Sequence, residues 1–191
     1  MFGKLLAPVG VTCLLLNAAA GLTTAAAQTA QQHAALAADS AFIQMAGSLG
    51  LLQVKLGKLA QEKGSSEVVR DFGKRMVADY SKANEELAAG AKQAAYPRPV
   101  LLIQHQQIYN RLSGVKRSAF DKSYMAEMMS QHDGAARLFQ DEAKDGRVQS
   151  LKQLASSLLP VVEQHEALST ETARSVGADV TATASQARRE S

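Results

Sequence analysis

The chain has 191 residues, a length that predicts one domain, and hydrophobic residues make up 46% of it while aromatic residues make up only 5%. Its formal net charge of +3 comes from 21 basic and 18 acidic residues that alternate in sign along the chain. That pattern forms no basic face, so it excludes nucleic acid as an expected partner and indicates a mixed, solvated surface. Abundant Ala, Leu, Gln, Lys and Glu favour helices over strands.

Residues 1–27 have the pattern of a secretory signal peptide. Lys4 gives a positive start, an apolar and Ala-rich run follows from Leu5 to Leu22, and Ala25-Ala26-Ala27 matches the small-residue cleavage signature. We expect cleavage after Ala27, which yields a periplasmic or secreted protein with no integral membrane span. The alternative is an uncleaved N-terminus that anchors the protein in the membrane. It is the weaker interpretation because a proline and several polar residues interrupt the apolar run.

Cys13, the only cysteine, lies in the segment that cleavage would remove. The mature chain is therefore expected to have no disulfide and no nucleophilic thiol. Its stability then comes from the hydrophobic core alone, which a chain of this size permits.

Residues 28–38, QTAQQHAALAA, predict a polar flexible linker that is either mobile or loosely helical, and residues 39–174 predict the folded domain. The first helix is expected to begin at Asp39, a residue suited to the N-cap, and to end near Lys63. Its hydrophobic residues recur at three- and four-residue spacing, which is the period of a helix with one buried face. Gly64 then ends it.

Three more long helices and one short helix follow, separated by proline, glycine or serine. The predicted ranges are about 67–94, 100–112, 118–144 and 147–174. Ser118 and Asp121 form an acidic variant of the capping box, and Pro160 is expected to kink the last helix. The small and polar residues 175–191 predict a disordered tail. The fold class is therefore all-α, a four-helix bundle with a short extra helix between the second and third long helices.

The chain contains the segments GLLQVKLGKLA, VVRDFGKRMVADYSKANEEL, FDKSYMAEMMSQHDGAARLF and LKQLASSLLPVVEQHEAL. Together these segments resemble the exported bacterial domain-of-unknown-function family 4142, over about residues 40–172. The most specific matches are Met-Val-Ala-Asp at 76–79, Phe120-Asp121 with Tyr124, His132, and Leu159-Pro160 with His165. The resemblance implies a ferritin-like helical bundle in the cell envelope and implies no established activity.

The chain departs from that family's pattern at two polar positions. Gln53 stands where the pattern has Glu, and Asp79-Tyr80 stands where it has Asp-His, whereas His132 and His165 are retained. If the family's glutamate and three histidines form a site, this chain has lost part of it.

Two histidines occupy positions in the apolar stripes of their helices. His132 shares a stripe with three methionines, and His165 stands where an aliphatic residue is expected. His132 lies 14 residues before the turn at Gly146 and His165 lies 19 residues after it. This difference corresponds to an offset of about 7–8 Å along the helix axes. We therefore hypothesise that both rings lie in one buried pocket.

Two interpretations of this pocket remain open. It is either structural or a soft-metal site. In the structural case, methionines fill gaps in the core and the histidines are hydrogen-bonded to Asp79, Tyr80, Gln53 or a buried water. Thioether and imidazole ligands suit Cu(I), and the envelope is where exported copper proteins work. The candidate ligands are His132, His165, Met76, Met125, Met128 and Met129.

No catalytic constellation is recognisable. The di-iron form of a ferritin-like bundle needs glutamates followed three residues later by histidine, and the chain has no such pair. Nothing assembles a nucleophile, a base and an oxyanion site. We therefore expect an exported, non-enzymatic bundle with a binding or envelope-stress role, and as the alternative a copper-binding or copper-carrier protein. The sequence indicates no particular partner.

Overall fold

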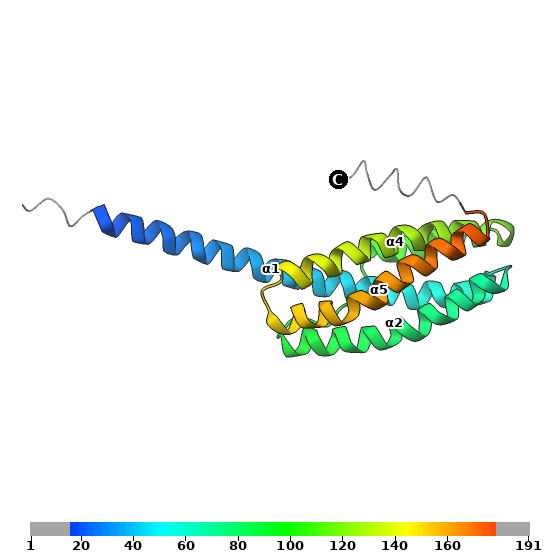
Figure 1. Ribbon diagram of the computed structural model, residues 1–191, viewed down its shortest axis with the longest axis horizontal. Helices are drawn as coiled ribbons and strands as arrows, with labels where there is room; N and C mark the ends of the chain where they lie inside the picture. Colours follow the sequence, from blue (N-terminus) through cyan, green and yellow to red (C-terminus); the bar gives the residue numbers. More distant parts are fainter. Residues whose placement is uncertain (1–15, 179–191) are drawn as a thin grey trace, which may run out of the picture.

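A computed structural model describes residues 16–178, with side chains described at His33 and from Leu36 onward. Within that range the chain forms helices and no strand (Figure 1). The helices are α1 (Leu16–Lys63), α2 (Glu67–Gln93), α3 (Ile103–Ser113), α4 (Arg117–Asp145) and α5 (Gln149–Ser175). Four of them are long and α3 is short, so the predicted bundle with a short extra helix is confirmed.

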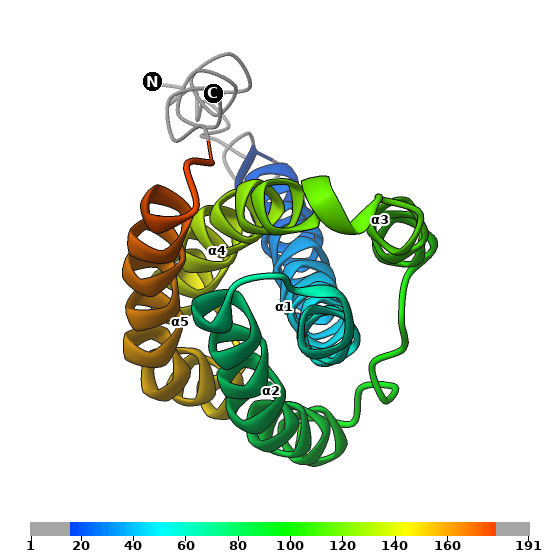
Figure 2. The same ribbon diagram turned by 90° about the vertical axis from the view of Figure 1, so that its right-hand side faces the viewer.

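The long helices pair as two antiparallel hairpins, α1 with α2 and α4 with α5. The hairpins pack so that α1 contacts α4 and α2 contacts α5, while α3 lies outside this square beside α1 (Figure 2). At one end of the crossover, the Gln44 side chain donates a hydrogen bond to the Pro97 carbonyl. At the other end, Lys63 donates to the carbonyls of Ser113 and Val115. The crossover therefore returns along α1 and makes α4 parallel to α2, which is the connectivity of ferritin-like bundles.

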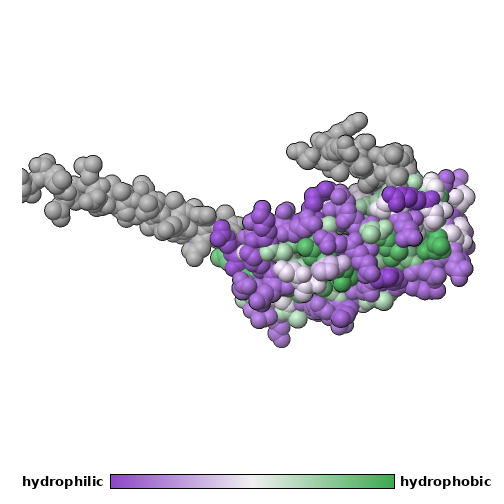
Figure 3. Space-filling model, viewed as in Figure 1, coloured by the Kyte–Doolittle hydropathy of each residue, from purple (hydrophilic) through white to green (hydrophobic). Residues whose placement is uncertain are grey.

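Each long helix buries one face, as the spacing of hydrophobic residues predicts. On α2 the buried residues are Val69, Phe72, Gly73, Met76, Tyr80, Leu87 and Ala91. Burial of such stripes supplies most of the free energy that holds amphipathic helices together. Figure 3 shows one outer face of the bundle as largely hydrophilic with scattered hydrophobic patches, as expected of helices with single stripes.

Helices α1 and α2 approach closely where two glycines face each other. A Cβ atom at Gly73 would lie 2.7 Å from the carbonyl oxygen of Gly57 and 2.8 Å from the Cβ of Ala60. A Cβ atom at Gly57 would lie 2.6 Å from the carbonyl oxygen of Gly73. These distances are shorter than van der Waals contact, so this helix spacing requires glycine at both positions.

The predicted start of the first helix is wrong. α1 begins at Leu16 rather than at Asp39, so residues 28–38, expected to be mobile or loosely helical, continue the same helix. Ala and Gln are good helix formers, and no Gly or Pro occurs between Gly21 and Gly47, so nothing in that stretch ends the helix. Figure 1 shows the first part of α1 projecting beyond the bundle.

Asp39 caps a different helix from the one predicted. It is buried, and its carboxylate accepts hydrogen bonds from the backbone N–H groups of Arg147 (3.0 Å) and Val148 (2.7 Å), just before α5. The first N–H groups of a helix have no partner within it and favour a negative charge. Asp39 of one hairpin therefore caps the helix that begins in the other.

Asp121 makes the reciprocal contact. Its carboxylate on α4 accepts hydrogen bonds from the backbone N–H groups of Ser65 (2.9 Å) and Ser66 (2.8 Å), at the start of α2. The predicted capping box with Ser118 is therefore wrong, because the carboxylate is engaged across the hairpins instead of within α4. Each hairpin thus supplies the cap of one helix in the other.

The remaining boundaries lie within three residues of the predictions, which is usual for helix ends. α5 continues through Pro160. The beginning of the predicted signal peptide and most of the predicted tail lie outside the described residues. Within residues 16–178, no helix is both long enough and apolar enough to cross a membrane.

Candidate functional site

The centre of the bundle holds two histidines side by side. His132 on α4 is fully buried and His165 on α5 is 1% exposed. Their ring centroids are 5.6 Å apart and their planes lie at 76°. The ring centroid of Tyr80 on α2 lies 6.0 Å from that of His132 and 5.3 Å from that of His165. The structure therefore brings these three residues into one buried cluster.

Helix α1 contributes Gln53, whose side chain is also fully buried. A Cβ atom at Gly50 would meet the side chain of Asn84 across the α1–α2 interface. Because the two helices are antiparallel, Gln53 lies about level with Tyr80. Each long helix thus places one polar residue at the same height in the core. We call this set the polar layer; it consists of Gln53, Tyr80, His132 and His165.

The hydrogen bond of His132 determines which ring nitrogen carries its proton. Nδ1 lies 2.8 Å from the carbonyl oxygen of Met128, one turn earlier on α4. A carbonyl only accepts, so Nδ1 carries the hydrogen and Nε2 of the neutral ring carries a lone pair. Nε2 is buried and has no hydrogen-bond partner among the described residues. Burial lowers the pKa of His132 to about 3, against the opposing effect of the Met128 carbonyl, so the ring is neutral at pH 7.

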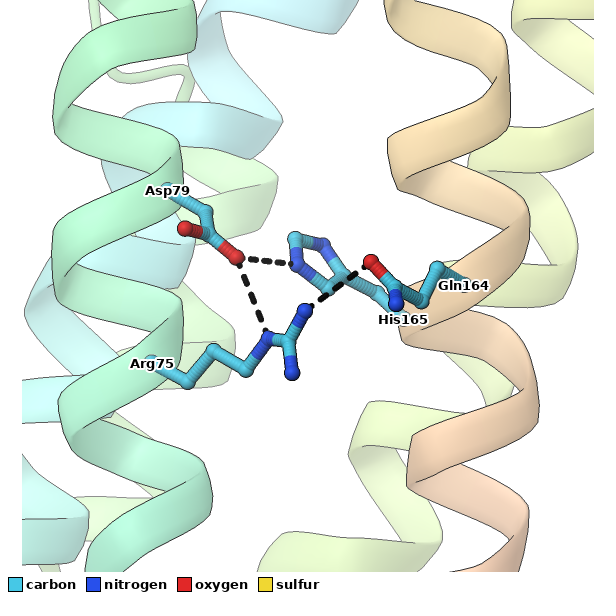
Figure 4. A network of polar contacts seen from close by, with 4 residues as sticks. All are labelled: Arg75, Asp79, Gln164 and His165. Atoms are coloured by element: carbon cyan, nitrogen blue, oxygen red, sulfur yellow. Dashed lines mark hydrogen bonds and ion pairs between the residues drawn. The ribbon is translucent and has the colours of Figure 1, made fainter.

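His165 has the opposite tautomer. Its Nε2 atom lies 2.8 Å from Oδ2 of Asp79 on α2 (Figure 4). A carboxylate accepts, so Nε2 carries the hydrogen and Nδ1 carries the lone pair. Nδ1 is buried and has no partner in the described part of the chain. Burial lowers the pKa of His165, although the hydrogen bond to Asp79 opposes this shift.

Asp79 connects the buried ring to the surface. Its side chain is 34% exposed, and Oδ2 also accepts a hydrogen bond from Nε of Arg75 at 3.3 Å. Arg75 in turn donates to Oε1 of Gln164 on α5 at 2.9 Å (Figure 4). An exposed ion pair of this kind contributes little stability by itself. Its structural effect is to tie α2 to α5 and to hold the carboxylate over His165.

Further buried polar atoms at and near the layer have no hydrogen-bond partner among the described residues. These atoms are both side-chain amide atoms of Gln53 and the hydroxyls of Tyr80 and Tyr124. Burial raises the pKa of both tyrosines, so their hydroxyls remain protonated and able to donate. A buried polar group without a partner costs about 1–3 kcal/mol. Gln53 and Tyr80 belong to the layer and need a partner there, whereas Tyr124 lies about two helical turns from His132 along α4.

The four candidate methionines are all buried, but they are not equally close to the layer. Met128 and Met129 lie one helical turn from His132, and Met76 lies one turn from Tyr80. Met125 lies seven residues from His132, about 10 Å along α4. The layer is therefore flanked by three thioethers, and Met125 belongs to the next part of the core.

A small cavity adjoins the layer. It has a volume of about 20 Å³, and its lining includes Asp79, Tyr80 and His165. A cavity holds one water molecule when about 10–15 Å³ is available to the centre of that water. The cavity therefore has space for a single water molecule beside Tyr80 and His165, and His132 does not line it.

The structure contains a third buried histidine, which the sequence did not indicate. His105 on α3 lies with its Nδ1 atom 2.6 Å from the hydroxyl of Ser48 on α1, and the same hydroxyl accepts a hydrogen bond from the N–H of Leu102 at 2.8 Å. Ser48 is fully buried, so the pair fastens the crossover to α1 and offers no accessible nucleophile. Residues so far apart in the chain gave no local signal of this contact.

Two antiparallel helical hairpins joined by one long crossover define an all-α four-helix bundle, whose centre here holds two buried histidines. A family model described as a domain of unknown function (DUF4142) matches residues 23–171, and the chain belongs to that family. No curated protein matches the chain, and no solved structure matches it. The family resemblance drawn from the four sequence segments is thereby confirmed.

Proposed function

We propose that this protein is an exported, non-enzymatic binding protein of the cell envelope and that its polar layer binds one Cu(I) ion. The observation that carries the proposal is the pair of free lone pairs on Nε2 of His132 and Nδ1 of His165. Each ring is oriented by a hydrogen bond at its other nitrogen, to the Met128 carbonyl or the Asp79 carboxylate. Histidines that bind metals are oriented in this way.

The spacing of the rings supports a shared ion. With metal–nitrogen bonds of about 2 Å, two imidazoles on one ion have ring centroids roughly 5–6 Å apart. The observed separation is 5.6 Å. This separation is compatible with one ion bound by both rings.

The ligand types favour a soft ion of low charge. Within the described residues no group of three or more His, Cys, Asp or Glu side chains is arranged to hold a metal ion. Further ligands then have to come from Met76, Met128 or Met129, and thioethers prefer Cu(I) to harder divalent ions. A monovalent ion also costs less to bury among neutral ligands than a divalent one.

Export is part of the proposal and is supported by the signal-peptide pattern of residues 1–27. Copper-binding methionine and histidine sites suit an oxidising envelope, where thiolate ligands form disulfides. The predicted mature chain has no cysteine, so it keeps only ligands that tolerate that environment.

Melting curves with and without reduced copper test the proposal. Copper that binds only the folded state raises the melting temperature of the mature protein as its concentration exceeds the Kd. We expect this rise to disappear in His132→Leu, which removes the Nε2 lone pair. The matched control is His33→Leu, which removes an exposed histidine of α1 and should respond as the wild type does. Wild-type curves that are the same with and without copper would contradict the proposal.

Asp79 is the positioning residue of this site. Asp79→Ala removes the acceptor that keeps the hydrogen on Nε2 of His165, and we expect Cu(I) affinity to fall about 10–100-fold. Asp71→Ala, on the same helix and exposed beside Lys74, is the control and should leave affinity unchanged. Nitrogen chemical shifts of His165 distinguish a change of tautomer from a general loosening of the bundle.

A structural polar layer is the second candidate, and the cavity of about 20 Å³ beside His165 favours it because one buried water fits there. In that case His132→Leu should be neutral or stabilising, since an apolar side chain of similar size removes a desolvation cost. Copper should then leave both proteins unchanged.

A further inference from the structure

A separate cavity of about 380 Å³ opens where α4 turns into α5, and its volume is within the range of small-molecule sites. Four of its lining residues are acidic: Asp39 from α1, and Asp141, Glu142 and Asp145 from the last turn and a half of α4. Glu142 lies ten residues after His132, about 15 Å along the helix axis. The cavity is therefore distinct from the polar layer.

Glu142 differs from the other acidic residues of this cavity because its carboxyl group is buried and has an unpartnered oxygen. Its side chain is buried, with 6% exposure, yet it lines the cavity and its Oε1 atom has no hydrogen-bond partner in the described part of the chain. Burial and the neighbouring Asp39 raise the pKa of Glu142 to about 7, while Lys152 of α5 lowers it. A buried carboxyl group without a partner is costly and calls for a donor or a positive charge.

The cavity lining holds no basic residue to neutralise these carboxylates. The carbonyl end of a helix is itself negative, so acidic residues in the last turn of α4 are unfavourable there. Asp39 is stabilised by the N–H groups that it caps, and Asp145 has only an exposed contact with Lys144 at 3.9 Å. The cavity is therefore a place where a cation lowers the free energy.

The rest of the lining decides which kind of cation fits. Phe42, Met45 and Leu138 give the cavity an apolar side. No group of carboxylates within residues 16–178 is arranged to hold a metal ion. We infer that the cavity binds a small aliphatic ammonium ion, whose charged end donates hydrogen bonds to Glu142 and whose alkyl chain lies against the apolar side.

Calorimetric titration of the full-length protein with pentylammonium chloride tests the inference. The titration is done at pH 8, where the probe is charged and Glu142 is largely ionised. We expect saturable one-to-one binding in the wild type and in Asp133→Asn, an acidic residue of α4 that pairs with Arg137 outside the cavity. Glu142→Gln keeps the shape of the side chain but loses the charge, so affinity should fall at least tenfold. A melting curve of this variant shows whether it is folded.

Two reference ligands make the result specific. 1-Pentanol has the same alkyl chain without the charge, and magnesium chloride supplies a cation without the chain. Binding of either as tight as that of pentylammonium would overturn the inference, and so would unchanged affinity in folded Glu142→Gln. His132→Leu should bind pentylammonium as the wild type does, which separates this site from the copper site.

Discussion

At the scale of single residues, the two histidines of the polar layer are the main finding. Their positions in the apolar stripes of α4 and α5 were readable from the sequence, and so was Asp79 as one candidate partner. Their tautomers were not, because they depend on the Met128 carbonyl and on a contact between residues 86 positions apart. Glu142 was missed for a related reason, since a glutamate in the last turn of a helix is usually solvated.

The buried histidines predict how the stability of the metal-free protein depends on pH. Both pKa values are lower in the folded state than the unfolded value of about 6.5, and that of His132 is lowered to about 3, so the unfolded chain binds more protons in this range. The free energy of unfolding should therefore fall as the pH is lowered from 6.5 to about 3, by up to about 1.4 kcal/mol per pH unit from His132, and His165 acts in the same direction.

Urea unfolding from pH 4 to 8 measures this slope, which should be shallower in His132→Leu. Glu142 contributes in the opposite direction, because its raised pKa gives stability that is lost as the pH rises towards 7. The comparison is therefore made in a Glu142→Gln background. Parallel pH profiles for the two proteins would show that His132 titrates normally and is not buried as described.

At the scale of elements, the helices were predictable because each one buries a single stripe and ends at glycine, proline or serine. The start of α1 was not, since Asp39 has the local features of an N-cap but caps α5 across the bundle. Asp121 likewise has the features of a cap for α4 but accepts a hydrogen bond from the backbone at the start of α2. A residue's preference for helix ends is local information, whereas the helix that it caps is decided by tertiary packing.

Replacing glycine by alanine should have opposite effects at Gly73, in the close contact of α1 and α2, and at Gly134, on an open side of α4. Gly73→Ala adds a Cβ atom 2.7 Å from the Gly57 carbonyl oxygen, and we expect a loss of about 1–3 kcal/mol from overpacking. Gly134→Ala on α4 adds a Cβ atom with nothing within 4 Å and should gain about 1 kcal/mol from helix propensity. Urea unfolding of both variants gives the two values. A stabilising Gly73→Ala would contradict the helix spacing described here.

At the scale of the whole molecule, the order of long and short helices indicated the bundle, and the four sequence segments indicated the family. The path of the crossover along α1 was not predictable, because it depends on side chains such as Lys63 and Ser48 that reach the connecting segment from another helix. The two departures from the family pattern, Gln53 and Tyr80, both lie in the polar layer. Any metal site in this chain therefore depends on the two histidines that remain in the layer.

For the whole chain, we predict export and cleavage of the N-terminal segment. Expression of the full sequence in a bacterial host should give an envelope-fraction protein that begins near Gln28. Mass spectrometry of its N-terminus decides between cleavage and anchoring. Recovery of an intact Met1 with the membranes would favour the anchored alternative.

A crystal structure of the copper-loaded protein, with anomalous scattering measured at the copper absorption edge, tests whether one Cu(I) ion binds in the polar layer. We expect one strong anomalous peak bonded to Nε2 of His132 and Nδ1 of His165, with a thioether of Met76, Met128 or Met129 completing the site. A peak at the surface, or a bundle whose core contains no copper under saturating conditions, would contradict it.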